Sequence, residues 1–160
     1  MSQLFNTTKY VFDSGPFIDL NNYPPDVFLT FWDKLNEMLK QVEIISSIEV
    51  YRELEDYNDE FVAEWTKKNK KYFLKPTLEE QELAKEILAK FPNLIKEDTI
   101  LAGKPLADPF VIAQAKLNNC ILVHQEKFKP NAHKIPNVCE HFKVKEISLF
   151  DFFRKEKWKF

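Results

Sequence analysis

Short runs of β-prone apolar residues alternate along this chain with longer stretches of helical periodicity. The apolar runs predict strands at Tyr10–Asp13, Glu43–Ser46, Cys120–His124 and Val144–Ile147. The stretches around and between them predict helices over residues 27–40, 48–56, 59–73 (beginning at Asp59), 77–92, 108–118, 138–142 and 148–155. Strands separated by helices are joined by crossover connections, which predicts a mostly parallel sheet in one α/β domain spanning residues 1–160.

Polar residues mark where several of these helices are expected to begin. Asp26 follows a Pro-Pro turn and is predicted as an N-cap, as are Ser47 and Ser148. The segment Thr77–Glu80 has the spacing of a capping box, in which the two side chains bond each other's backbone. Residues 125–136 are polar and rich in lysine, which predicts a loop.

The composition excludes some common classes of binding protein. With only 2 Gly against 9 Pro, the chain has no glycine-rich phosphate loop. The net charge of -2 gives no overall signature of nucleic-acid binding, although a local basic stripe would suffice for it. Cys120 and Cys139 lack metal-ligand spacing, so they are expected to be free thiols. No signal segment or membrane span is recognisable, and a cytoplasmic location is expected.

Four acidic residues are predicted to meet at one edge of the sheet. Asp13 ends the first strand, Glu53 lies in the helix after the second, Asp108 begins a buried helix, and Glu126 follows the strand at 120–124. Carboxylates packed together repel one another and persist where cations neutralise them. Oxygen ligands of this kind suit Mg²⁺ or Mn²⁺, which in such sites assist phosphodiester hydrolysis.

Each acid also has a simpler interpretation. Asp108, followed by Pro109, is suited to capping its helix. Glu126 stands in a lysine-bearing loop, where most acids face water, and Glu53 shares its helix with other acids. Asp13 is either a helix N-cap or a metal ligand, and it is the strongest of the four because the strand before it is expected to be buried.

Four short motifs, taken in order, resemble those of a PIN domain of the VapC-like branch, and most closely a PIN-like family described as of unknown function. The motifs are Tyr10-Val-Phe-Asp-Ser14, Ser46-Ser-Ile-Glu-Val-Tyr-Arg-Glu-Leu54, Leu106-Ala-Asp-Pro-Phe-Val-Ile-Ala113 and Ile121-Leu-Val-His-Gln-Glu126. Segments 134–139 and 147–153 are also typical of that family, so the resemblance covers essentially the whole chain.

The resemblance implies a three-layer α/β/α fold with a sheet of about four to five strands. It also implies an RNase that depends on Mg²⁺ or Mn²⁺, often the toxin of a toxin–antitoxin pair and often a homodimer. Asp13, Glu53, Asp108 and Glu126 match the family's four acids, and Ser14 matches the hydroxyl residue that supports the first. The alternative is a PIN-like module without catalysis that binds RNA or protein.

One motif departs from the family. The usual Thr-x-Asp or Thr-x-Glu is His124-Gln125-Glu126 in this chain, so the hydroxyl that would orient a ligand acid is missing. His124 could replace that hydroxyl, or it could be a histidine of the core; the second interpretation is favoured. Because glutamate is longer than aspartate by one methylene, Glu126 favours a water-mediated contact.

Two groups of lysines are candidates for contacts with RNA phosphates. Lys127, Lys129 and Lys134 lie just beyond Glu126, at the expected metal edge. Lys67, Lys68, Lys70 and Lys71 form a stripe beside Tyr72 that could follow a phosphate backbone, although a solvated helix face is favoured for it. A small-molecule phosphohydrolase ranks below both nuclease and binding module, because no second aspartate follows Asp13 in an Asp-x-Asp arrangement.

Overall fold

A five-stranded parallel sheet forms the centre of the computed structural model, which describes residues 7–57 and 61–160. The strand order is β3-β2-β1-β4-β5, and every neighbouring pair is parallel. The strands are β1 (Tyr10–Phe12), β2 (Ile44–Ser47), β3 (Phe73–Leu74), β4 (Ile121–Val123) and β5 (Glu146–Ile147). The predicted parallel α/β architecture is therefore confirmed.

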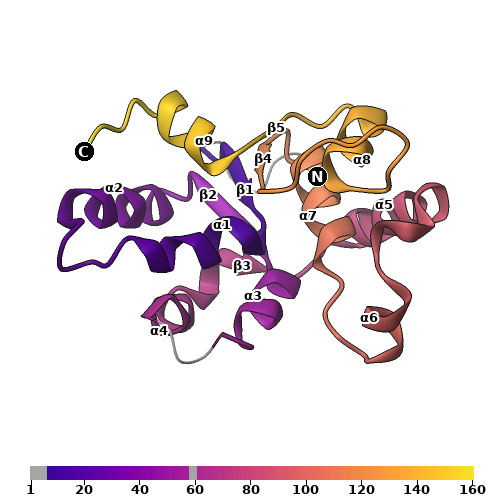
Figure 1. Ribbon diagram of the computed structural model, residues 1–160, viewed down its shortest axis with the longest axis horizontal. Helices are drawn as coiled ribbons and strands as arrows, with labels where there is room; N and C mark the ends of the chain where they lie inside the picture. The colour runs from indigo at the N-terminus through magenta and orange to yellow at the C-terminus, as the bar shows by residue number, and fades with distance from the viewer. Residues whose placement is uncertain (1–6, 58–60) are drawn as a thin grey trace.

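Helices cover both faces of the sheet and make three layers (Figure 1). On one side α2 and α9 lie over the strands, and on the other α7 lies over them with α5 and α8 beside it. The helices are α1 (Ser14–Asp19), α2 (Leu29–Lys40), α3 (Ile48–Leu54), α4 (Phe61–Lys68), α5 (Leu78–Lys90), α6 (Glu97–Leu101), α7 (Ala107–Leu117), α8 (Ile135–Phe142) and α9 (Leu149–Lys155). Three 3₁₀ turns join them: η1 (Leu20–Asn22), η2 (Lys70–Tyr72) and η3 (Pro92–Leu94).

The central strand β1 is buried on both faces, as a parallel strand between two helical layers must be. Tyr10 and Phe12 point to the same face, where the ring of Phe152 from α9 packs edge-on against both, with centroids 4.8 and 5.0 Å away. Phe17 packs against Phe12 and, through Trp65, links α1 to α4. The core on this side is therefore built from aromatic rings.

Three of the predicted helix starts are confirmed by side-chain caps. The Ser47 hydroxyl accepts from the Glu49 amide, and the Ser148 hydroxyl accepts from the Asp151 amide. Thr77 and Glu80 form the predicted capping box at the start of α5. Local side-chain chemistry accounts for these boundaries without help from the rest of the fold.

Asp26 and Asp108, which are suited to capping a helix by their sequence, are not N-caps in the structure. In each case the helix begins at a different residue. Asp26 lies in a turn in which the amides of residues 27 and 28 both donate to the Pro24 carbonyl, so α2 starts at Leu29. Leu106 is the N-cap of α7, which places Asp108 inside the first turn rather than before it. The expected cap interpretation of Asp108 therefore fails, and its carboxylate needs another explanation.

Two element boundaries also differ from the sequence prediction. The helix predicted over residues 59–73 divides into α4, η2 and the short strand β3, and its first residue, Asp59, lies outside the described residues. The loop after β4 ends earlier than expected, because α8 begins at Ile135 with Pro136 in its first turn.

Cys120 and Cys139 are buried free thiols, as expected. Across residues 7–57 and 61–160, no helix has both the length and the apolar character needed to cross a membrane.

Candidate functional site

Asp13 stands at the point where β1 ends and α1 begins. Its backbone amide donates to the Val123 carbonyl at 3.0 Å, which ties it to the end of the neighbouring strand β4. Its backbone is extended at the N-cap position of α1, yet its side chain forms no capping bond there. Asp13 is 7% exposed, and its Oδ1 atom is buried with no hydrogen-bond partner in the structure. The metal-ligand interpretation of Asp13 explains an unpaired oxygen better than the cap interpretation does.

The surroundings of Asp13 favour its protonated form when no cation is present. Burial first, and then the charges of Glu53 and Glu126, raise the pKa of this carboxyl to about 7. The Ser14 amide donates to the carboxylate and opposes the rise. A carboxylate that resists ionisation at neutral pH indicates a local excess of negative charge.

Glu53 reaches the same edge from α3, one strand away. Ser14 and Ala107 provide a hydroxyl and an amide that hydrogen-bond its carboxylate and favour ionisation, while burial and the charge of Glu49 raise its pKa overall. The residue is only partly buried. Ser14 was expected to support Asp13 with its hydroxyl; in the structure its amide serves Asp13 and its hydroxyl serves Glu53.

Asp108 joins the group from the first turn of α7. A helix N-terminus ordinarily stabilises a carboxylate. The pKa of Asp108 is nonetheless raised well above its usual value, first by burial and then by the charges of Asp13, Glu126 and Glu53. The charges of Glu53 and Glu126 therefore act on both Asp13 and Asp108 at this edge. We call these four residues the acidic edge.

Glu126 is the most loosely placed member of the acidic edge. Its side chain is exposed, and its Oε2 atom accepts a hydrogen bond from the Ile135 amide at 2.8 Å. That bond satisfies one of the free amides at the start of α8. One carboxylate oxygen of Glu126 is thus used to connect the loop after β4 to the start of α8.

His124 turns out to support Glu126 from the core. It is 2% exposed, its Nδ1 accepts from the Glu126 amide at 3.0 Å, and its Nε2 lies 2.8 Å from an oxygen of Glu146. Because Nδ1 accepts, Nε2 carries the proton and donates it to the Glu146 carboxylate. His124 is therefore buried, as favoured from the sequence, and it also fixes the backbone from which Glu126 extends.

Gln125 fastens the same loop to α1. Its side-chain amide donates to the Asp19 carboxylate, and its methylenes lie over Gly15. A Cβ added at Gly15 would lie 3.2 Å from Cγ of Gln125, which is a tight contact. A glycine one residue after Ser14 therefore lets this loop approach the first turn of α1 closely.

Two buried polar residues behind the acids, Ser46 and Gln114, were not predicted as part of the site. The Ser46 hydroxyl donates to the Phe12 carbonyl at 2.6 Å, and Gln114 Nε2 donates to the Ser46 carbonyl at 2.9 Å. Together they fix the end of β1 just before Asp13. Gln114 interrupts the apolar run of residues 109–115 in α7, and that interruption was the available signal.

The acidic edge has the donor chemistry of a divalent-cation site. Its donors are hard carboxylate oxygens, and one of them, Asp13 Oδ1, is buried without a partner. In the part of the chain that the structure describes, no group of three or more His, Cys, Asp or Glu side chains is arranged so that it could hold a metal ion. The chemistry of the acids therefore fits a cation, while their side chains do not already surround one.

Residues 10–160 match the family described as "Domain of unknown function (DUF4411)". The chain belongs to this family. Its match begins at the first residue of β1 and includes every member of the acidic edge. No curated protein matches the chain.

In this DUF4411 domain, the two groups of candidate lysines lie in different surroundings. Lys129 and Lys134 line a hollow of about 640 Å³ together with Glu126, and Lys127 follows Glu126 directly in the same loop. Lys129 and Lys134 therefore lie near Glu126, the outermost member of the acidic edge.

The stripe at residues 67–71 lies elsewhere in the DUF4411 domain. Lys70 and Lys71 belong to η2, which directly precedes β3 at the edge of the sheet. Lys67 pairs with Glu64, whereas Lys70 and Lys71 lie over the rings of Tyr51 and Tyr72. With Lys68 in the exposed last turn of α4, this position favours the solvated-face interpretation.

Proposed function

We propose that this protein is a divalent-metal-dependent endoribonuclease that hydrolyses phosphodiester bonds of RNA at the acidic edge. The observation that carries the proposal is that the charges of Glu53 and Glu126 act on two buried carboxyls, Asp13 and Asp108, beside the unpartnered Asp13 oxygen. A cluster of this kind is unfavourable by itself and becomes favourable when a cation neutralises it.

Mg²⁺ or Mn²⁺ is the proposed cation, held by Asp13, Glu53, Asp108 and Glu126. When bound, it would supply a hydroxide nucleophile near neutral pH and stabilise negative charge on the phosphodiester. The chain's own residues prepare the site. Asp13 and Asp108 are presented by rigid element ends, and Ser14 and Ala107 orient the Glu53 carboxylate.

The lysines beside Glu126 are proposed to hold the RNA. Lys129 and Lys134 line the hollow that Glu126 also lines. Lys127 lies between Glu126 and Lys129 in the sequence. Exposed lysines bind phosphates as point charges without reading sequence. They would keep a phosphate chain next to the carboxylates that hold the cation.

The resemblance to PIN domains supports the same activity. The fold expected for a PIN domain, a parallel sheet between helical layers, is compatible with the architecture of this chain. A role as the toxin of a toxin–antitoxin pair, with an antitoxin partner and a homodimeric state, is carried by the resemblance alone. The proposal includes a location in the cytoplasm, whose reducing conditions keep thiols such as Cys120 and Cys139 free.

A second candidate is a PIN-like module that binds RNA or protein without cleaving it. The observation that favours it is the placement of Glu126, which is exposed and uses one oxygen to bond the Ile135 amide. If Glu126 does not join the other acids, the site has three carboxylates, and cation binding would be weaker.

Cleavage of RNA under controlled metal conditions separates the two candidates. The native protein is expected to cut a mixed-sequence single-stranded RNA in millimolar Mn²⁺ or Mg²⁺, to stop in EDTA, and to resume when Mn²⁺ is restored. The reaction is followed by denaturing gel electrophoresis. Absence of cleavage with either metal, under conditions in which the protein is folded, would favour the binding module.

A further inference from the structure

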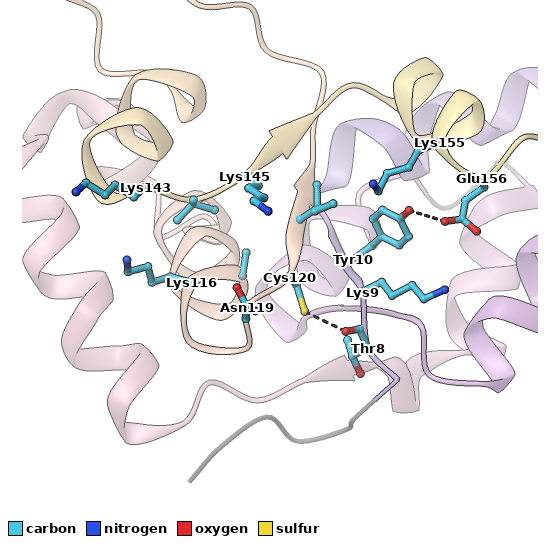
Figure 2. Close-up of a pocket in the computed structure, with 13 residues that line it drawn as sticks. Thr8, Lys9, Tyr10, Lys116, Asn119, Cys120, Lys143, Lys145, Lys155 and Glu156 are labelled. Carbon is cyan, nitrogen blue, oxygen red and sulfur yellow. Dashed lines mark hydrogen bonds between the residues drawn. The ribbon is translucent and has the colours of Figure 1, made fainter.

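The opposite edge of the sheet carries a hollow of about 590 Å³ rimmed by lysines (Figure 2). It lies where strands begin: Lys9 directly precedes β1, Cys120 precedes β4, and Lys145 precedes β5. The acidic edge lies at the far ends of the same strands. The hollow is therefore separate from the proposed catalytic site.

The rim gathers positive charge from several elements. Lys116 from the last turn of α7 and Lys143 from the end of α8 lie on one side, and Lys9 and Lys155 lie on the other, with Lys145 between them (Figure 2). Lys116 and Lys143 each lie at the C-terminal end of a helix, where the helix dipole stabilises a positive charge. Together the five lysines concentrate positive charge in a protein whose net charge is -2.

Little of that charge is neutralised by the protein itself. Lys9 pairs with Glu43 at 2.8 Å. Within residues 7–57 and 61–160, Lys116, Lys143, Lys145 and Lys155 form no ion pair. Glu156 is the one acid in the lining, and it accepts a hydrogen bond from the Tyr10 hydroxyl at 2.5 Å.

The floor of the hollow adds no further negative charge. Burial raises the pKa of the Cys120 thiol to about 11, so this group is neutral at pH 7, and it donates weakly to the Thr8 and Asn118 carbonyls. Burial and Glu156 likewise raise the pKa of Tyr10, which stays a neutral donor. The result is a neutral floor under a cationic rim.

We propose that this hollow is a binding site for phosphate groups, independent of any metal and distinct from the acidic edge. Four unpaired ammonium groups around one concavity suit a ligand with several closely spaced negative charges, and lysine binds phosphate as a point charge. The volume is that of an ordinary small-ligand site. The phosphates come either from a small phosphorylated molecule or from the backbone of RNA that passes along this edge.

Titration calorimetry in EDTA tests the proposal with pyrophosphate, ADP and a cleavage-resistant 12-nucleotide RNA as probes. In the variant Lys116→Gln/Lys143→Asn/Lys145→Gln, all three positions are exposed, and asparagine suits the positive φ of 58° at residue 143. This variant is expected to bind pyrophosphate about tenfold more weakly than the native protein. A control variant, Lys75→Gln/Lys85→Gln/Lys90→Gln, removes the same charge from other exposed lysines and should change the affinity less than about twofold.

The probes also identify the source of the phosphates. If the 12-nucleotide RNA loses affinity in the hollow variant but not in the control, the hollow follows an RNA backbone; if only pyrophosphate and ADP lose affinity, it takes a small molecule. The proposal is overturned if no phosphate probe binds saturably, if the control variant weakens binding equally, or if citrate binds as tightly as pyrophosphate. Because metal is absent throughout, none of these outcomes depends on whether the acidic edge cleaves RNA.

Discussion

Asp13→Asn is expected to change stability and activity in opposite directions. In EDTA at pH 8 the variant should be more stable than the native protein by about 3–4 kcal/mol, because it removes a buried charge that repels its neighbours. The same variant should cleave RNA at least about a hundredfold more slowly with Mn²⁺, because the cation loses its central ligand. Urea denaturation and initial cleavage rates measure the two effects.

Asp151→Asn is the matched control for this substitution. Asp151 is an exposed aspartate in the first turn of α9 and pairs with Arg154 at 2.8 Å. Its replacement should change stability by less than about 0.5 kcal/mol and leave cleavage unaltered. A destabilised Asp13→Asn protein would show that Asp13 has a structural role, and full activity in it would exclude Asp13 from the site.

The stability of the metal-free protein is expected to fall as the pH rises from 5 to 8. Asp13 in the unfolded chain loses its proton at about pH 4. In the folded protein it keeps that proton up to about pH 7. Between these values the folded state binds more protons than the unfolded state, so raising the pH favours unfolding. The raised pKa values of Asp108 and Glu53 act in the same direction.

Urea denaturation in EDTA at several pH values between 5 and 8 measures this slope. Relative to Asp13→Asn, the native protein should lose about 2–3 kcal/mol over that range. A concentration of Mn²⁺ one hundred times its dissociation constant should restore about 2.7 kcal/mol at the upper end. Parallel pH profiles for the two proteins would mean that Asp13 ionises normally and that the acidic edge carries no electrostatic strain.

The central part of the fold could be predicted because its determinants are local. A β-branched and aromatic run such as Tyr10–Phe12 specifies a buried strand, and Ser47, Thr77 and Ser148 cap helices through bonds within a few residues. The convergence of Asp13 and Asp108 follows from topology, because parallel strands end on one edge and the next helices begin there.

The parts that were missed depend on contacts between distant residues. Strand β3 has two residues and exists because it pairs with Ser46 and Ser47, which no local periodicity reveals. The position of Glu126 depends on where α8 begins, because the Ile135 amide bonds the Glu126 carboxylate. It also depends on the hydrogen bond from the Glu126 amide to His124. Asp108 resembles an N-cap in sequence, yet the N-cap of α7 is Leu106, two residues earlier.

His124 illustrates how the partners of a buried histidine stay hidden in the sequence. The sequence favoured a core imidazole, and the buried ring also accepts a hydrogen bond from the Glu126 backbone amide, which the sequence did not reveal. Its two nitrogens connect the Glu126 amide to the Glu146 carboxylate, which links the loop after β4 to β5.

Direct measurement of Mn²⁺ binding tests the claim that the acidic edge is a divalent-cation site. Electron paramagnetic resonance of free Mn²⁺ at pH 7.5 should show saturable binding to the native protein and to Asp151→Asn. Asp13→Asn should bind at least about tenfold more weakly. Equal binding by the native and Asp13→Asn proteins, or no saturable binding by either, would contradict the claim.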